Sequence, residues 1–342
     1  MPTSPECWIL GWPNAVTSSA LAKRVEDAGW DGFLLPDTQC LAAESYIQLA
    51  LCGAATKRLK LATGVTNPVT RDPSVVACAI ATLQEETEGR VSLGIGRGDS
   101  SLAYIGQESA RLGVLRDFLI DLQTYLSGEY VDREGFASSI KLVRESQQPK
   151  VPVDVSGTGP KILEMAAKHA DGITLAVGAY PERIASKIAA VEAALAKHGR
   201  SREDFTISVY LNCVADENLA AARDLSRGTA ATVARFSGMG PHAASDLSPE
   251  DQAVVAKLHA EYDMQYHASC QAQHAKNLPD DFLDRFAILG HPDEVVERIH
   301  KVMGASIDRL VLVAASPGAA AGLAEKNVAR LSADVLPRLR KA

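Results

Sequence analysis

The sequence lacks a basic excess, a long apolar run and paired cysteines, and each absence argues against a class of protein. Its 35 Lys and Arg against 42 Asp and Glu give a net charge of −7, which argues against a dedicated nucleic-acid-binding protein. No uncharged apolar run approaches the ~20 residues that span a bilayer. The first residues have neither the basic start nor the apolar core of a secretion signal, so we expect a cytoplasmic protein with no membrane partner. The six cysteines contain no CxxC pair, so we expect neither disulfides nor a structural zinc site.

The alternation of short apolar runs with helical patterns indicates the fold class. The 342 residues, 46% hydrophobic and 23% charged, suit either two average domains or one large α/β barrel. Strands are predicted at 7–11, 32–36, 59–66, 91–96, 153–157, 173–177, 206–214 and 309–314. Helices are predicted at 19–28, 74–86, 111–126, 161–168, 181–198 and 293–302. This pattern predicts a single (β/α)8 TIM barrel over residues 1–342, with a doubly wound sheet as the alternative.

The segment between the seventh and eighth predicted strands is far longer than the ~30 residues of an ordinary connection. Residues 227–280 are predicted to form a helical insertion over the barrel mouth and not a separate domain. This segment contains His259, His267 and His274, and on one helix 267 and 274 would share a face. A metal site is an alternative, but the HExxH spacing is missing, so we expect pocket-lining or solvated histidines and no metal.

Glycines at the ends of the third and fourth strands indicate a ligand site. Gly64 lies inside a strand, which is typical of a bulge or of close approach to a ligand, although a simple strand exit is equally compatible. Residues 93–99 imitate a dinucleotide fingerprint, but Asp99 occupies the place of the third glycine. Three alternating glycines at a strand end instead let a flat ligand approach the backbone.

The loop after the fifth strand has the features of a phosphate site. Pro160 suits the first turn of a helix, and free N–H groups there, with the Ser156 and Thr158 hydroxyls, suit a phosphate. An ordinary capped junction is the alternative. No GxxxxGK[ST] motif is present, so nucleotide hydrolysis is not expected. Asp37 and Thr38, at the end of the second strand, either face the same mouth or cap the next segment.

Taken together, these motifs resemble the luciferase-like superfamily of flavin- and deazaflavin-dependent oxidoreductases, and within it the methylenetetrahydromethanopterin-reductase-type branch. The resemblance runs from about residue 8 to 315 and is weakest across the insertion. Its most specific motif is 63–73, Thr-Gly-Val-Thr-Asn-Pro-Val-Thr-Arg-Asp-Pro. The supporting motifs are 93–99, 154–160, 170–173 and 285–290.

The resemblance implies a cofactor at the C-terminal mouth of the barrel. It implies a non-prolyl cis peptide at Gly64-Val65, in a bulge that supports one face of the cofactor ring. Thr38 stands where deazaflavin relatives often carry a histidine, and Asp72 replaces the histidine of the commoner Arg-His-Pro. The cofactor-binding residues implied are Asp37, Thr38, Thr63, Gly64, Val65, Thr66, Asn67, Gly96, Arg97, Gly98, Asp99, Ser156, Gly157, Thr158, Gly159, Gly178 and Ala179.

The function expected is an F420-dependent oxidoreductase that transfers a hydride between the deazaflavin and a small organic substrate. Asp37 and Asp99 are the acid–base candidates by elimination, together with His267, while Arg71, His267 and His274 are expected to bind substrate. Basic residues at the mouth, such as Arg97, would favour the acidic tail of F420 over FMN. The alternatives are an FMNH2-dependent two-component monooxygenase served by a separate flavin or F420 reductase, and a non-catalytic flavin-binding relative. The resemblance and the apolar helices favour a homodimer.

Overall fold

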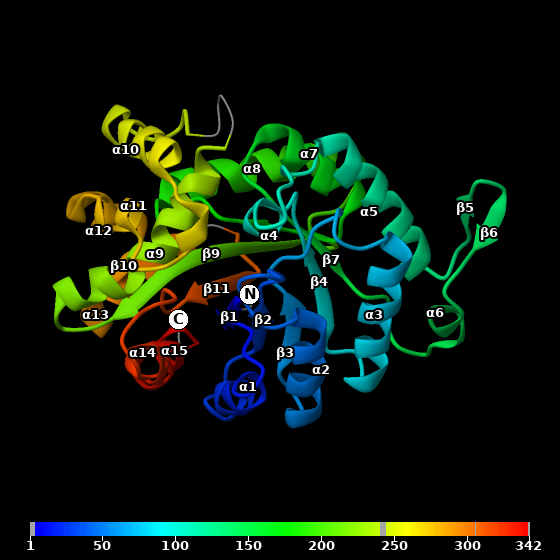
Figure 1. Cartoon of the computed structure of the whole chain (residues 1–342), viewed down its shortest axis with the longest axis horizontal. Coiled ribbons are helices and arrows are strands. Elements are labelled where there is room, and N and C mark those ends of the chain that lie inside the picture. Colours follow the sequence, from blue (N-terminus) through cyan, green and yellow to red (C-terminus); the bar gives the residue numbers. More distant parts are fainter. Residues whose placement is uncertain (1–3, 240–243, 305, 341–342) are drawn as a thin grey trace.

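The computed structural model describes residues 4–239, 244–304 and 306–340; of the predicted span 1–342, the remaining positions lie outside the described residues. Eight parallel strands within the described chain close into a barrel (Figure 1). They are β1 (Glu6–Leu10), β2 (Gly32–Leu35), β3 (Lys60–Thr63), β4 (Val91–Ile95), β7 (Val153–Ser156), β8 (Gly172–Leu175), β9 (Thr206–Ala215) and β11 (Arg309–Val313). The barrel is closed because β9 pairs with both β8 and β11. The predicted fold class is therefore confirmed, and each barrel strand overlaps its predicted range.

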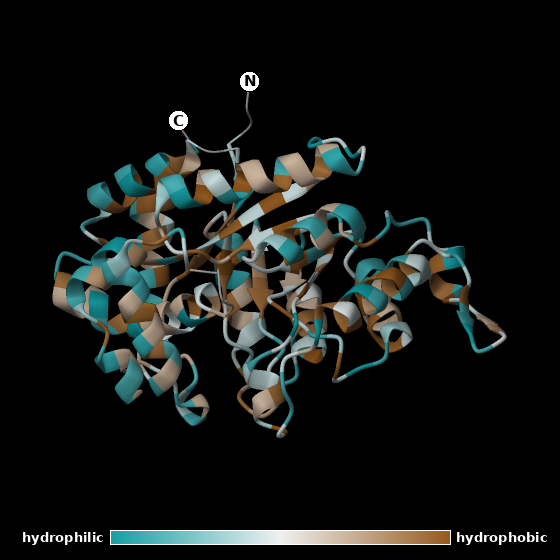
Figure 2. Cartoon of the chain, turned by 90° about the horizontal axis from the view of Figure 1, so that it is seen from above, coloured by the Kyte–Doolittle hydropathy of each residue, from teal (hydrophilic) through white to brown (hydrophobic). Residues whose placement is uncertain are grey.

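A ring of helices covers the strands, with apolar strands at the centre and hydrophilic outer faces on most helices (Figure 2). The ring contains α1 (Ser18–Asp27), α2 (Ser45–Ala55), α3 (Pro73–Glu86), α5 (Leu112–Leu126), α7 (Pro160–His169), α8 (Pro181–Lys197), α9 (Leu219–Ser237) and α13 (Pro292–Met303). Several begin as the sequence dictates: Asp72 caps α3 by accepting a bond from the Ser74 N–H at 2.9 Å, and Pro73 follows it. Helix α2 was not predicted, because apolar residues surround its axis and leave no helical period to detect.

Some elements lie outside the eight-fold pattern. Between β4 and β7 come α4 (Ser100–Ala103), a hairpin of β5 (Val131–Arg133) and β6 (Phe136–Ser138) that projects from the barrel in Figure 1, and α6 (Lys141–Glu145). The chain ends with α14 (Leu323–Arg330), a π-helical turn η2 (Leu331–Val335) and α15 (Leu336–Leu339). The buried Asn327 side chain joins α14 to two barrel strands, since it donates to the carbonyls of Cys213 and Ala314 and accepts from the Ala215 N–H.

Glycines inside the barrel make room for a few large side chains. A Cβ on Gly32 would lie 2.1 Å from Cδ2 of Trp8, which is 1% exposed. Towards the N-terminal end, Arg309 pairs with Asp154 at 2.6 Å and lies over the Trp8 ring at 4.2 Å. Burial raises the pKa of the Asp154 carboxyl. Residues at this end of a barrel contribute to stability, so we assign the ion pair a structural role that fills the N-terminal end of the barrel.

The segment between β9 and β11 is helical, as predicted. It contains α9, α10 (Pro249–Glu261), the 3₁₀ turn η1 (Met264–Tyr266), α11 (Gln273–Lys276), α12 (Asp280–Phe286) and β10 (Ile288–Gly290), which pairs with the end of β9. The predicted boundary at 227 falls inside α9, and within 227–280 residues 240–243 lie outside the described part. His267 and His274 do not share a helix, because a turn separates η1 from α11, and His259 is exposed on α10. Among the described helices, none is long and apolar enough to cross a membrane.

Candidate active site

The carboxylate of Asp37, at the C-terminal end of β2, is held by two side chains from the β3 loop. Thr66 Oγ1 donates to Asp37 Oδ2 at 2.7 Å, and Arg71 Nη1 lies 2.5 Å from the same oxygen. Arg71 also pairs with Glu44 at 2.6 Å and lies over the Tyr46 ring at 4.8 Å. The Asp37 side chain is 1% exposed, so its charge is balanced inside the protein. Asp37 therefore positions Thr66 at the strand end, and its ion pair with Arg71 holds the Arg71 side chain against the barrel.

The end of β3 forms the expected bulge. The Gly64-Val65 peptide is cis, as the resemblance implied. Thr63 Oγ1 donates to the Gly94 carbonyl at 2.8 Å, and the Thr66 N–H donates to the same carbonyl at 2.9 Å. Thr63 and Thr66 are fully buried, whereas Gly64 and Val65 keep partial exposure. A Cβ on Gly64 would lie 2.8 Å from the Tyr210 hydroxyl, so close packing requires the glycine.

The loop after β4 lies against this bulge. A Cβ on Gly96 would come within 3.1 Å of Val65 Cγ2, and Gly98 has φ +77°, a conformation that favours glycine. Arg97 is fixed by its neighbours, since its Nε donates to the Ala110 carbonyl at 2.5 Å. Asn67 Oδ1 accepts from the N–H groups of Val69 and Thr70, so its side chain organises its own turn. Its Nδ2 lies 3.4 Å from Ser101 Oγ.

A cluster from the insertion contacts the β4 loop; we call Arg235, Tyr262, His267 and His274 the insertion cluster. Arg235 pairs with Asp99, and both side chains are largely buried. The Arg235 guanidinium lies over the Tyr262 ring at 4.8 Å, and the Tyr262 hydroxyl lies 3.0 Å from His267 Nδ1. Burial lowers the pKa of His267 to about 3, with the charges of Arg235 and His274 adding to the effect, so its imidazole is neutral at pH 7. The structure thus brings the predicted His267 and His274 towards the predicted Asp99.

The loop for which the sequence predicts a phosphate site runs from the end of β7 to the start of α7. Gly159 precedes the helix, and Thr158 is 8% exposed. The N–H groups of Thr158 and Gly159 have no hydrogen-bond partner within the described chain. The neighbouring loop after β8 is built for close packing, because Gly178 has φ +80° and the Ala179 N–H donates to the Phe286 carbonyl at 2.9 Å. Ser156 pairs with Thr174 in register, which places the two loops side by side.

These features fit a flat cofactor with a phosphate. The partly exposed Gly64-Val65 surface and the glycines of the β4 loop leave room beside the backbone. Thr38 Oγ1 is buried and has no partner among the described residues, which leaves a hydrogen-bonding group for a ligand. The free N–H groups at α7 suit an anionic oxygen. No group of three His, Cys, Asp or Glu side chains converges as a metal site in the described residues.

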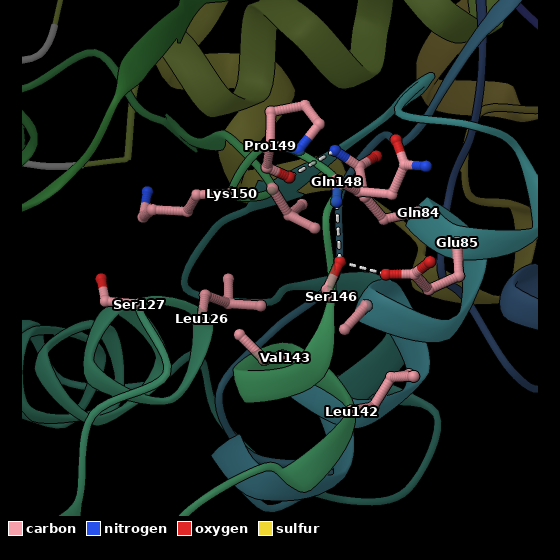
Figure 3. A pocket seen from close by; sticks show the side chains of 12 residues that line it. Gln84, Glu85, Leu126, Ser127, Leu142, Val143, Ser146, Gln148, Pro149 and Lys150 are labelled. Carbon is pink, nitrogen blue, oxygen red and sulfur yellow. Dashed lines mark hydrogen bonds between the residues drawn. The ribbon is translucent and has the colours of Figure 1, made fainter.

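Two cavities in the described part of the chain lie away from this mouth. One of about 180 Å³ lies where α3, α5 and α6 meet, where Ser146 Oγ contacts Glu85 and accepts from the Gln148 N–H (Figure 3). The other, of about 330 Å³, lies at α13 near Leu289 and Arg298. No predicted site residue lines either cavity, so we assign the site from the strand ends and loops.

Sequence reasoning missed Glu44, Tyr46, Tyr210, Arg235 and Tyr262. Glu44 and Tyr46 belong to the start of α2, which has no helical period. Tyr210 is separated by more than a hundred residues from the bulge that it supports, and Arg235 and Tyr262 belong to the insertion, where no motif marks them. Only the position of Tyr210 on a predicted strand with alternating polarity could have indicated that it faces the barrel interior.

The fold is a (β/α)8 barrel, a class whose enzymes carry their active sites at the C-terminal mouth, where the candidate residues of this chain lie. The chain belongs to the luciferase-like monooxygenase family, whose model matches residues 14–309. It is 28% identical to a 5,10-methylenetetrahydromethanopterin reductase of Archaeoglobus fulgidus, over 93% of this chain and 94% of the relative. It is 29% identical to an F420-dependent glucose-6-phosphate dehydrogenase of Microbacterium testaceum, over 97% of this chain and 90% of the relative.

Among solved structures, the coenzyme F420-dependent tetrahydromethanopterin reductase of Methanopyrus kandleri resembles the chain with a TM-score of 0.75. The two are 22% identical, and the match covers 98% of this chain and 100% of the other. At this identity the likeness supports the fold alone. The family resemblance inferred from the motifs is confirmed by the family model and by these relatives.

Proposed function

We propose that the protein is an F420-dependent oxidoreductase that transfers a hydride between the deazaflavin and a small organic substrate. One combination of features at the mouth carries the proposal. It consists of a partly exposed cis bulge, a glycine-rich β4 loop and N–H groups at the start of α7 that have no partner among the described residues. The name of one relative given above supports the deazaflavin over FMN, since that glucose-6-phosphate dehydrogenase is F420-dependent by name.

In this proposal, the cofactor residues divide into three groups. Gly64 and Val65 support one face of the ring, while Thr63, Thr66 and Asn67 keep the bulge in shape. Thr38 offers its unpaired hydroxyl to the ring edge, and Gly96, Arg97, Gly98 and Asp99 border the ring and side chain. Ser156, Gly157, Thr158 and Gly159 hold the phosphate, beside Gly178 and Ala179. When bound, the deazaflavin supplies the carbon that gives or takes the hydride.

Asp99 is the better candidate for proton transfer of the two predicted carboxylates. Asp37 already binds Thr66 and Arg71 in a fully buried position, so we assign it a positioning role. Asp99 keeps partial exposure and, among the residues that the structure describes, forms an ion pair with Arg235 alone. His267 is held by Tyr262 as a neutral ring, so we assign it to the substrate side of the site.

Titration of the purified apoprotein with F420 and with FMN tests the cofactor. We expect F420 to quench the intrinsic fluorescence at a lower concentration than FMN. Thr158→Glu places a negative charge at the phosphate loop and should weaken F420 binding by about tenfold or more. Ser186→Glu, on the exposed face of α8, is the control for an added charge away from the site. Tight FMN binding with no F420 affinity would replace the proposal by the FMNH2-dependent monooxygenase.

The outer face of α2 and α3 supports the homodimer that the sequence suggested. Helix α2 carries no charged side chain, and Ile47, Leu51 and Val75 are 60%, 47% and 54% exposed. The two helices pack side by side (Figure 1), and the three exposed apolar side chains lie on this pair of helices. We propose that a second copy covers this surface. Leu51→Lys should shift the mass in solution from dimer to monomer, and Ile120→Lys on α5 should not. The cytoplasmic location and a separate reductase stay predictions.

A further inference from the structure

The insertion cluster has an aromatic centre with polar groups around it. The Tyr262 hydroxyl lies 2.9 Å from Thr232 Oγ1 and 3.0 Å from His267 Nδ1. The His274 ring packs on the Tyr262 ring with centroids 4.1 Å apart. Since Arg235 lies over the same tyrosine and pairs with Asp99, His274 is linked through Tyr262 and Arg235 to the loop after β4.

The hydrogen bonds of His274 determine which nitrogen carries its proton. The Asp263 backbone N–H donates to His274 Nδ1 at 3.2 Å, so Nδ1 must present a lone pair. Burial lowers the pKa of the ring, which is therefore neutral and carries its proton on Nε2. His274 is 3% exposed, and its Nε2 has no partner among the described residues. A buried donor without an acceptor is unfavourable, and an acceptor from a ligand would remove that cost.

The described residues of the insertion cluster leave no unpaired positive charge beside His274. The guanidinium of Arg235 is paired with Asp99. His267 is neutral at pH 7, and one carboxylate oxygen of Asp263 accepts from the Gln265 N–H at 2.9 Å. A phosphate or carboxylate placed here would lack an unpaired cation among the described cluster residues and would lose its hydration. A neutral oxygen acceptor meets no such penalty.

We propose that the substrate is an uncharged molecule whose carbonyl or hydroxyl oxygen accepts a hydrogen bond from His274 Nε2. This inference rests on the proposed function, since it assigns the substrate class of the same site. In this proposal, the imidazole that binds the substrate belongs to the insertion. The loop after β2, where deazaflavin relatives often carry a histidine, has Thr38 instead. Tyr262 then has a positioning role, because its ring orients His274 and its hydroxyl holds His267.

Binding of simple probes to the whole protein tests the substrate class. Cyclohexanone and cyclohexanol, against cyclohexanecarboxylate and cyclohexyl phosphate, are titrated by ligand-observed NMR with and without F420. We expect the neutral pair to bind at least tenfold more tightly than the anions. His274→Phe keeps an aromatic ring on Tyr262 and should weaken the neutral probes by about three- to tenfold. His259→Phe, on the exposed face of α10, is the matched control and should change nothing.

Two measurements separate this proposal from the proposed function. The F420 dissociation constant of His274→Phe should equal that of the wild type. If neither protein binds F420, the proposed cofactor is wrong, whereas the role of His274 in substrate binding is not contradicted. In wild-type protein labelled with 15N-histidine, the shifts should show the Nε2–H tautomer of His274, whether or not the variant folds. Tighter binding of the anionic probes, an Nδ1–H or doubly protonated ring, or equal affinities of variant and wild type would overturn the proposal.

Discussion

Acidification should destabilise the protein through His267, whose neutral ring is part of the insertion cluster. Burial and the nearby charges of Arg235 and His274 lower its pKa from 6.5 to about 3. As the pH falls below about 6.5, His267 therefore binds a proton in the unfolded chain but stays neutral in the folded chain. The contribution of His267 to stability is complete above this value and decreases as the pH falls towards about 3. Between about pH 7 and about pH 5, the linkage relation gives a loss of about 2 kcal/mol.

Urea unfolding of wild type and His267→Asn at these two pH values measures this contribution. Other groups also titrate, so the relevant quantity is the difference between the two proteins in their change of unfolding free energy. The wild type should lose about 2 kcal/mol more than the variant. Equal losses would show that His267 keeps an ordinary pKa and would remove the argument that it stays neutral. The hydrogen bond between Thr232 and Tyr262 does not involve residue 267 and is kept in both proteins, so the two proteins differ only at the titrating side chain.

Three further substitutions test the packing of the site and the barrel. Arg71→Ala leaves the buried Asp37 carboxylate without its cation and should cost about 3–5 kcal/mol in urea unfolding, whereas adding Asp37→Asn should restore part of the loss; no recovery would contradict the pairing. Gly32→Ala should cost about 1–3 kcal/mol, because its Cβ would meet the Trp8 ring at 2.1 Å; an unchanged melting temperature would refute the close packing. Asn327→Leu should cost at least about 2 kcal/mol, since three backbone groups lose their partner, and a smaller loss would indicate that water replaces the amide.

The strands and the cis bulge were predictable because their signals are local. Each barrel strand is a short apolar run next to a turn, and period and length suffice to detect it. The bulge is marked by a glycine between β-branched residues, and the resemblance supplied the cis bond at Gly64-Val65. Helix α2 was not predictable in this way. Its apolar residues face both the barrel and the exposed surface where we propose a second copy, so they show no helical period.

The site residues divide in the same way. The motifs pointed to Asp37, Asp99, His267 and His274 as separate candidates, without an order among them. The structure shows that Asp37 is occupied by Thr66 and Arg71, whereas Asp99 meets the insertion through Arg235. Neither pairing has a sequence signal, because a salt bridge between residues 99 and 235 depends on how two loops far apart in the chain come together.

The sequence by itself determined the barrel, the family and the loops that face its mouth, since these follow from hydrophobic period and from glycines that the backbone requires. The tertiary structure alone decided which charges are cancelled and which polar atoms remain unpaired. The reason is physical: the protonation of His267 and the free Nε2 of His274 among the described residues depend on burial and on residues of other elements, such as Arg235 of α9, whose charge helps to lower the pKa of His267. The substrate class that we propose depends on that second kind of information.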